Sequence, residues 1–396
     1  MEANNDMARH RSCPNASTRC CLLAILLIWI CAPLLGQCDI RWTEHHGIPG
    51  ADGEVFAVAE WDPDGAGPLQ PRLVAGGRFG AIGGTAARHL AVRDPQTSRW
   101  SEIGGGVDGW VHDILPLPNG QLVVVGDFVN AGAIQVNRVA RWDGVAWQSF
   151  GTGCLYQPNA LTLLPNGDIV VSGYFPQIDN VMAANIARWD GVAWHAMGTG
   201  LPQGGAVPPA LLGGELLAVE DRSVRRWDGT QWHHFVQTNG TIHSLATDGV
   251  ARVLIAGFFQ SVGPASISRL ALWDGLTWQG VGNLGSSVTR AWLLRNGDPV
   301  IGMGSLNVGS GTAFGLARWD GSAWHAFGTG VSAAPFQLEE LSSGNIVVAG
   351  SFSRPGLRIA EWDGSTWHSA SPGCDGEIRA AVTLSSGATV VAGSYT

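Results

Sequence analysis

Apolar residues recur along the chain in short runs, and the runs come in pairs separated by a turn. Three such pairs are VHDILPLP-NG-QLVVVGDF (111–128), ALTLLP-NG-DIVVSGYF (160–175) and LEELSS-G-NIVVAGSF (338–352). Apolar runs of this length bounded by turn residues are typical of β-strands. No segment after residue 36 keeps a period of 3.6 residues, so we expect an all-β chain and no helical repeat.

A second pattern follows each pair of runs. The phrase RWDGVAW (141–147) recurs at 188–194, 226–232, 272–278, 318–324 and 361–367, with a weaker copy at 93–100 in which Arg93 replaces the first tryptophan. The first tryptophans stand at positions 142, 189, 227, 273, 319 and 362. A period of about 45 residues is typical of a propeller blade or a solenoid unit. With two strands before the phrase and two strands around it, each unit predicts a four-stranded blade.

The turn residues predict how the strands connect. Asn119-Gly120, Asn166-Gly167 and Asn296-Gly297 predict mirror-image hairpin turns, which need positive φ. If Asp143-Gly144 forms a two-residue turn, Trp142 pairs with Val145, and Trp147 lies on the same face of the sheet. Because this tryptophan pair recurs at one structural position in every unit, we expect it to pack between blades. The alternative, an exposed aromatic ladder for sugars, is not favoured.

The two ends of the chain predict how the ring closes. Trp42 stands where a second tryptophan is expected, and residues 378–386 and 388–396 have the pattern of a first and a second strand, with Tyr395 in the place of Phe128. We therefore expect a β-propeller of four-stranded blades over residues 37–396, with seven or eight blades. Eight are favoured, the last being incomplete and closed by the N-terminal strand. The unit at 206–232 is short, because its loop after Glu220 is almost absent.

Strand direction sorts the connections into two faces. The tight turns fall on one face, and the longer second-to-third loops emerge with the blade-to-blade crossovers on the other. These longer loops include residues 129–136, 176–184, 260–267 and 307–313. Because recognition usually resides in variable loops on a rigid scaffold, we expect any ligand at this loop-rich face or at the mouth of the central channel.

The N-terminal segment has the pattern of an export signal. Arg9, Arg11 and Arg19 precede an uncharged apolar run at 21–36 that is too short for a spanning helix. We expect residues 1–36 to be a cleaved secretory signal, and the protein to be periplasmic, cell-surface or extracellular. Anchoring by the signal, or by a lipid at Cys38, is the alternative. The cysteines left after cleavage, Cys38, Cys154 and Cys374, match neither a disulfide framework nor a zinc pattern.

Composition narrows the chemistry. The chain has 396 residues, a formal charge of −9 and no lysine, which excludes P-loop, Schiff-base and S-x-x-K chemistry. An acidic chain is also a poor partner for nucleic acid. We expect a monomer without a membrane span after signal cleavage.

Taken together, the WDG-x-x-W units resemble the kelch-like repeats of secreted bacterial β-propellers, over about residues 40–396. The resemblance implies the fold. The closest relatives it suggests are uncharacterised, so no catalytic residue is carried over from it.

Candidate chemistry is sparse. Four histidines follow the second tryptophans, His195, His233, His325 and His368, but in different blades, so we expect solvent-facing residues rather than a metal cluster. The repeated Asp is expected to stabilise its turn. We predict no catalytic, cofactor-binding or metal-ligating residues and no cofactor. The expected function is an exported noncatalytic scaffold for an unknown protein or carbohydrate, and the alternative is a glycan-active or redox propeller enzyme with a site at the channel mouth.

Overall fold

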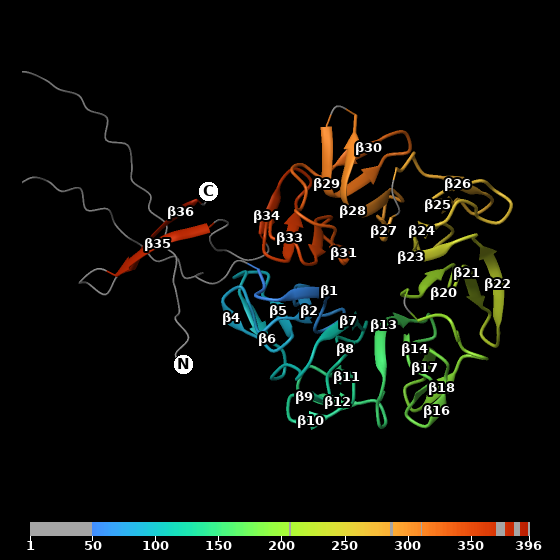
Figure 1. Cartoon of the computed structure of the whole chain (residues 1–396). Helices are drawn as coiled ribbons and strands as arrows, with labels where there is room; N and C mark the ends of the chain where they lie inside the picture. Colours follow the sequence, from blue (N-terminus) through green and yellow to red (C-terminus); the bar gives the residue numbers. More distant parts are fainter. Residues whose placement is uncertain are drawn as a thin grey trace, which may run out of the picture.

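The described part of the chain forms a ring of seven radial β-sheets around a central opening (Figure 1). The computed structural model describes residues 50–369, except 206, 286, 287 and 310, and the backbone of residues 377–383 and 389–394. Trp42, Tyr395, the expected signal at 1–36, Cys38 and Cys374 lie outside these residues.

Each blade takes its four strands from one continuous segment, in the order first to fourth from the centre outward. Blade 1 contains β1 (Glu54–Trp61), β2 (Arg72–Arg78), β5 (Leu90–Arg93) and β6 (Trp100–Glu102). Blade 2 contains β7 (Val111–Pro116), β8 (Leu122–Gly126), β11 (Val139–Trp142) and β12 (Trp147–Ser149). Blade 3 contains β13 (Gln157–Leu163), β14 (Ile169–Tyr174), β17 (Ile186–Trp189) and β18 (Trp194–Ala196). Blade 4 contains β19 (Ala210–Leu212), β20 (Glu215–Glu220), β21 (Ser223–Trp227) and β22 (Trp232–Gln237).

The remaining three blades follow the same order. Blade 5 contains β23 (Thr241–Thr247), β24 (Val253–Phe258), β25 (Leu270–Trp273) and β26 (Trp278–Gly280). Blade 6 contains β27 (Arg290–Leu293), β28 (Pro299–Val308), β29 (Gly311–Trp319) and β30 (Trp324–Ala326). Blade 7 contains β31 (Gln337–Glu340), β32 (Ile346–Ala349), β33 (Ile359–Trp362) and β34 (Trp367–Ser369). Three small hairpins lie in second-to-third loops: β3 (Ala81–Ile82) with β4 (Thr85–Ala86), β9 (Asn130–Ala131) with β10 (Ile134–Gln135), and β15 (Gln177–Ile178) with β16 (Val181–Met182).

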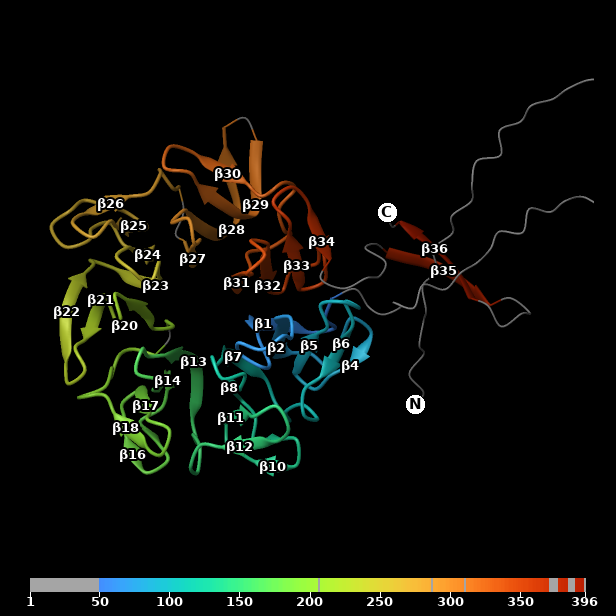
Figure 2. The same ribbon diagram turned by 180° about the vertical axis from the view of Figure 1, so that it is seen from behind.

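The prediction of eight blades is wrong, because blade 7 packs directly on blade 1. Gln337 Nε2 donates to Val58 O at 3.2 Å, and the backbone N–H of Ser342 donates to the Glu60 carboxylate at 2.8 Å. The backbone N–H of Ala51 donates to Leu357 O at 3.1 Å. Both views of the ring show the two blades side by side (Figures 1 and 2). The predicted C-terminal strands do form, as β35 (Glu377–Thr383) and β36 (Thr389–Ser394), but within the described residues they pair only with each other.

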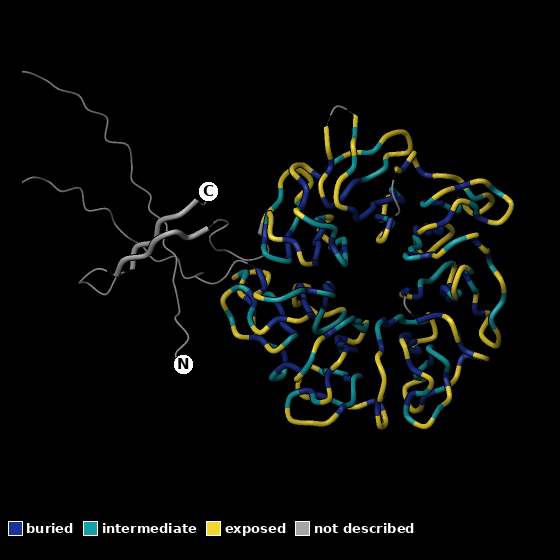
Figure 3. The backbone as a smooth tube through the Cα atoms, viewed as in Figure 1, coloured by how far each residue is buried: buried dark blue, intermediate teal, exposed yellow. Residues whose placement is uncertain are grey.

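The core lies between neighbouring blades. Val123, Val125 and Val139 of blade 2 share one buried cluster with Ile169 and Val171 of blade 3. Buried backbone is concentrated in the inner strands, and exposed stretches lie at the outer rim (Figure 3). Each blade therefore gains its stability from its neighbours, as expected for stacked repeat units.

The turns differ in type from the prediction. In the first turn of blade 2 only Gly120 has positive φ (+81°), and the N–H of Leu117 donates to Gln121 O at 2.8 Å. A mirror-image turn needs two positive φ values, so this prediction is wrong, and the turn is a three-residue loop closed by a left-handed glycine. The predicted pairing of Trp142 with Val145 is also wrong, because Trp142 lies opposite Trp147.

Candidate functional site

The tryptophan pairs of blades 2 and 3 are structural, as predicted. Trp142 and Trp147 are cross-strand partners with ring centroids 5.3 Å apart. The second indole also reaches the preceding blade: Trp147 Nε1 donates to Gly104 O at 3.0 Å, and Trp194 Nε1 to Phe150 O at 3.2 Å. Indoles of this kind join blades and are not available to a ligand.

The repeated aspartate and the histidine behind it also form a local unit. Asp190 Oδ1 accepts the N–H groups of Val192 and Ala193, both at 2.8 Å, and His195 Nε2 lies 2.6 Å from Asp190 Oδ2. These contacts, with the backbone bonds first, lower the pKa of Asp190 to about 2. The same aspartate–histidine pair occurs at 228/233, 320/325 and 363/368. Gln148 replaces the histidine in blade 2, with Nε2 donating to Asp143 at 2.6 Å.

These histidines are partly exposed and lie in separate blades, as predicted. Among the residues that the structure describes, no group of three or more histidine, cysteine, aspartate or glutamate side chains could hold a metal ion. Cys154 is buried and free, and burial raises the pKa of its thiol to about 11, which is unfavourable for nucleophilic chemistry.

Two carboxyl groups near the centre of the ring join blades. Asp113 of β7 accepts the N–H of Leu161 in the next blade at 2.8 Å, and burial raises its pKa to about 7. Burial, followed by the nearby charge of Glu60, raises the pKa of Glu339 to about 7, and Glu339 accepts a hydrogen bond from the backbone of Glu60. A raised pKa is a signal of function as well as of structure. Here both groups are engaged by backbone of the neighbouring inner strand.

The channel mouth on the loop-rich face is mainly aromatic where blades 7, 1 and 2 meet. Phe56 packs against Trp110 and Phe336, with centroids 6.4 and 5.8 Å away. The Arg78 guanidinium lies 4.7 Å from the Trp110 ring centroid, and His112 Nε2 lies 3.3 Å from Asp127. These charged groups are matched locally.

Side chains fix the loop-rich face in a way that the sequence patterns did not suggest. Arg138, Asn185, Arg269 and Arg358 precede third strands with φ between +66° and +75°. Arg138, Asn185 and Arg269 each donate to a carbonyl of the following blade-to-blade crossover, as Arg269 Nη1 does to Leu284 O at 2.8 Å, and Arg358 donates to Ala51 O ahead of β1. The recurrence of Arg or Asn before these four third strands was the available signal. The face is therefore rigid, and several arginines are structural.

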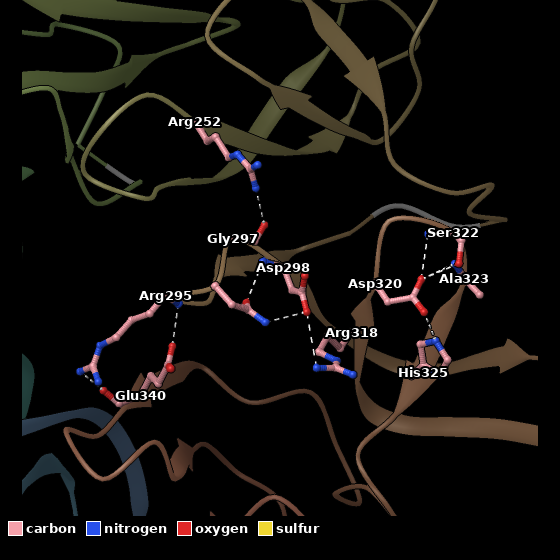
Figure 4. Close-up of polar contacts among 11 residues, drawn as sticks. Arg252, Arg295, Gly297, Asp298, Arg318, Asp320, Ser322, Ala323, His325 and Glu340 are labelled. Carbon is pink, nitrogen blue, oxygen red and sulfur yellow. Dashed lines mark hydrogen bonds and ion pairs between the residues drawn. The ribbon is translucent and has the colours of Figure 1, made fainter.

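The turn face carries a second set of interblade contacts (Figure 4). Arg252 of blade 5 donates to Gly297 O of blade 6 at 3.3 Å, and the N–H of Arg295 donates to Glu340 of blade 7 at 2.7 Å. Asp298 and Arg318, 3.4 Å apart, join two strands within blade 6. These polar groups are therefore used in joining the scaffold.

Blade 4 differs from blades 1, 2 and 3 on the loop-rich face. In blades 1, 2 and 3 the hairpin in the second-to-third loop contacts the fourth strand, β4 on β6, β10 on β12 and β16 on β18. In blade 4, Asp221 and Arg222 alone connect β20 to β21. The fourth strand β22 has six residues, where β12 and β18 have three. This strand is consequently left uncovered.

A groove lies beside this short connection and is lined in part by Arg222. We call it the blade 4 groove, and its volume is about 760 Å³. It runs from the end of β22 to the second-to-third loop of blade 5. Its lining contains Arg222, His234, Phe235, Val236, Gln237, Thr238, Asn239, Ser261, Gly263, Pro264 and Trp278.

Two aromatic side chains form the apolar part of the groove. Phe235 and Trp278 lie with centroids 6.2 Å apart at 75°. The equivalent pair between blades 2 and 3 is closed: Phe150 is 2% exposed and Trp194 is 4% exposed. Phe235 and Trp278 are only partly buried, and within the described residues Trp278 Nε1 makes no hydrogen bond of the kind that Trp194 makes. The aromatic contact between Phe235 and Trp278 is therefore partly exposed in the groove, whereas the equivalent contact between blades 2 and 3 is buried.

The polar part of the groove is held in place by backbone contacts. The N–H of Thr238 donates to Arg222 O at 2.9 Å, and the Thr238 hydroxyl donates to Gly240 O at 2.6 Å. Asn239 Oδ1 accepts the N–H groups of Gln260 and Ser261 at 2.8 and 3.0 Å. The side chains of Arg222, His234 and Gln237 are exposed. Exposed donors on a fixed backbone favour binding, because little conformational entropy is lost when the ligand binds.

A second groove, of about 550 Å³, lies at the seam of blades 7 and 1. It occurs where Arg93 stands in the position of the first tryptophan. Arg93 Nη1 lies 3.2 Å from Glu361, which also accepts Asn345 Nδ2 at 2.7 Å. The charged groups on this seam are thus paired within the protein.

Comparison with known proteins supports a propeller and assigns no function. A family model described as a β-propeller domain of unknown function, DUF5122, matches residues 117–142. No curated protein matches significantly. The match to DUF5122 agrees with the propeller part of the resemblance drawn from the repeats, but it does not name a kelch-like family.

Solved structures give low similarity scores. A streptogramin B lyase has a TM-score of 0.49 at 12% identity, covering 79% of this chain and 94% of that chain. The WD40 β-propeller domain of Doa1 has 0.47 at 14%, covering 79% and 93%. Virginiamycin B lyase from Staphylococcus aureus has 0.47 at 13%, covering 77% and 94%. These values support no inference about activity. In the described residues no helix has the length and apolarity needed to cross a membrane.

Proposed function

We propose that this chain is an exported, noncatalytic β-propeller that binds a protein or carbohydrate ligand on its loop-rich face, and that the blade 4 groove is the binding site. The observation that carries the proposal is the open contact between Phe235 and Trp278, beside exposed donors on fixed backbone. A concave site with an aromatic wall and a few placed polar groups is the usual form of a ligand pocket.

The other candidate positions support this choice of site. The carboxyl groups of Asp113 and Glu339 accept hydrogen bonds from backbone of the next blade. The aspartate–histidine pairs are distributed around the ring, and the groove at the 7–1 seam has its charged groups paired. The blade 4 groove combines exposed donors with partly exposed aromatic rings.

A loop graft tests the proposal. Residues 221–222 are replaced by a copy of residues 175–185, the blade 3 loop whose hairpin contacts β18. The matched control replaces residues 128–138 of blade 2, a loop of equal length, with the same copy. Ligands are first identified for the full chain on a glycan array and in pull-downs, and affinities are then measured by titration calorimetry.

We expect the blade 4 graft to weaken binding at least about tenfold, because it covers both aromatic rings, and the blade 2 graft to bind like the wild type. Equal binding by both grafted proteins would show that the site lies elsewhere. Mass spectrometry of secreted protein tests export separately: an intact residue 1 contradicts signal cleavage.

A further inference from the structure

The charges around the blade 4 groove differ from those of the whole chain. The protein carries a formal charge of −9, yet the described lining of the groove contains one arginine, one histidine and no carboxylate. A ligand that enters this groove therefore meets donors and a positive charge on an otherwise acidic molecule. This pattern favours an anionic ligand over a cationic one.

Arg222 is the residue best placed to meet an anion. Its carbonyl accepts the N–H of Thr238 at 2.9 Å, and the N–H of Asp221 donates to Gln203 O at 3.2 Å. The side chain is 54% exposed, and its ion pair with Asp221 is long, 3.9 Å, and equally exposed. Such a pair is weak. Within the described residues, the Arg222 side chain makes no contact with a crossover carbonyl of the kind that Arg138 and Arg269 make. Its planar guanidinium can therefore bind a carboxylate by donating two parallel hydrogen bonds to it.

The other side of the groove fits a sugar ring. Phe235 and Trp278 present partly exposed rings at 75° to each other, and the C–H groups on one face of a pyranose pack well against such rings. Gln237 and Ser261 supply amide and hydroxyl groups, which can both donate to and accept from sugar hydroxyls. An aromatic corner, neutral hydrogen-bonding groups and one arginine lie within a single groove.

We propose that the blade 4 groove binds an acidic saccharide, with a pyranose ring against Phe235 and Trp278 and the ring's carboxylate at Arg222. This inference rests on the proposed function and adds the class of ligand. An acidic peptide would share the contact with Arg222 but would not need the aromatic corner formed by Phe235 and Trp278.

The test compares three probes by titration calorimetry on the full chain: tetragalacturonate, its methyl ester and poly-L-glutamate. The ester keeps the rings and hydroxyls of the first probe and lacks its negative charges. We expect tetragalacturonate to bind at least about tenfold more tightly than either other probe. Its affinity should fall as salt is raised from 0.05 to about 0.5 M, because the charges at an exposed arginine are screened.

Variants of Arg222 then separate the contribution of the charge from that of the aromatic rings. Arg222→Gln should weaken tetragalacturonate about tenfold and leave the ester unchanged, while Arg222→Lys should recover part of the loss. Arg354→Gln, at an exposed arginine on the loop of blade 7, is the matched control and should bind like the wild type.

Three results would overturn the acidic-saccharide class: equal affinity for the ester, full binding by Arg222→Gln, or equally tight binding of poly-L-glutamate. The proposed function fails separately. If the blade 4 graft binds tetragalacturonate as the wild type does, the groove is not the site. If the wild type binds a neutral glycan and the blade 4 graft abolishes this binding, the groove is the binding site and only the assignment of an acidic saccharide as its ligand is wrong.

Discussion

Truncating two equivalent tryptophans tests whether the blade 4 groove opens a contact that is sealed at another seam. Trp194 and Trp278 occupy the same register position, opposite Trp189 and Trp273. Trp194 is 4% exposed and donates across the seam at 3.2 Å. Replacing a buried tryptophan by alanine costs about 3–5 kcal/mol, of which the lost hydrogen bond contributes about 1 kcal/mol.

For Trp278→Ala the cost should be smaller. Part of the ring already faces the groove, and no interblade hydrogen bond is lost in the described residues, so we expect about 1–2.5 kcal/mol. The assay is urea unfolding followed by far-UV circular dichroism, comparing each variant with the wild type. Equal losses for the two variants, or a larger loss for Trp278→Ala, would refute the conclusion that this contact is open to solvent.

Three further predictions concern stability. Arg93→Trp and Glu361→Arg each break the ion pair at the 7–1 seam and should each lower the free energy of unfolding by about 1–3 kcal/mol. The double variant restores the repeat pattern of both blades and should recover most of this loss in a double-mutant cycle. Simple additivity of the two losses would contradict a direct interaction between Arg93 and Glu361. Asp113 and Glu339 have pKa values raised to about 7, compared with about 4 in an unfolded chain, so the folded state holds more protons than the unfolded state between these pH values. The free energy of unfolding should therefore fall as pH rises from about 5 to 8. Asp113→Asn combined with Glu339→Gln should flatten this dependence of the free energy of unfolding on pH. Gly104 has φ +56°, and an added Cβ would lie 2.3 Å from the ring of Trp142, so Gly104→Ala should cost about 2 kcal/mol or more in the same unfolding assay.

The repeat phrase was sufficient to predict the blades. Two apolar runs, WDG and a second tryptophan specify four antiparallel strands, because alternation and turn residues are local properties of the sequence. Six copies and the weak copy at Arg93 correspond to the seven blades observed. The detailed turn types were missed, because the six-residue phrase from Trp142 to Trp147 is compatible with more than one register, and the aspartate caps select the wider turn.

Ring closure could not be derived from the ends of the chain. The pattern around Trp42 and in the last two strands suggested a shared eighth blade, but the number of blades depends on the angle between packed sheets, which is a property of the whole ring. Contacts such as that between Gln337 and Val58 join residues far apart in sequence, so they cannot be predicted from a local sequence pattern.

The position of the proposed site follows from the sequence only in part. The sequence pointed to the loop-rich face and showed that the loop after Glu220 is almost absent, but it did not show that this absence leaves a groove. That conclusion needs the packing of β10 on β12 in blade 2 and of β16 on β18 in blade 3. Phe235 and Trp278 belong to the repeat pattern, so their exposure could be recognised only in three dimensions.

A crystal structure of the full chain with tetragalacturonate would show directly where the ligand binds. We expect a sugar ring against Phe235 and Trp278, with its carboxylate within hydrogen-bond distance of Arg222. Ligand bound in the central channel or at the 7–1 seam, with the blade 4 groove empty, would contradict it.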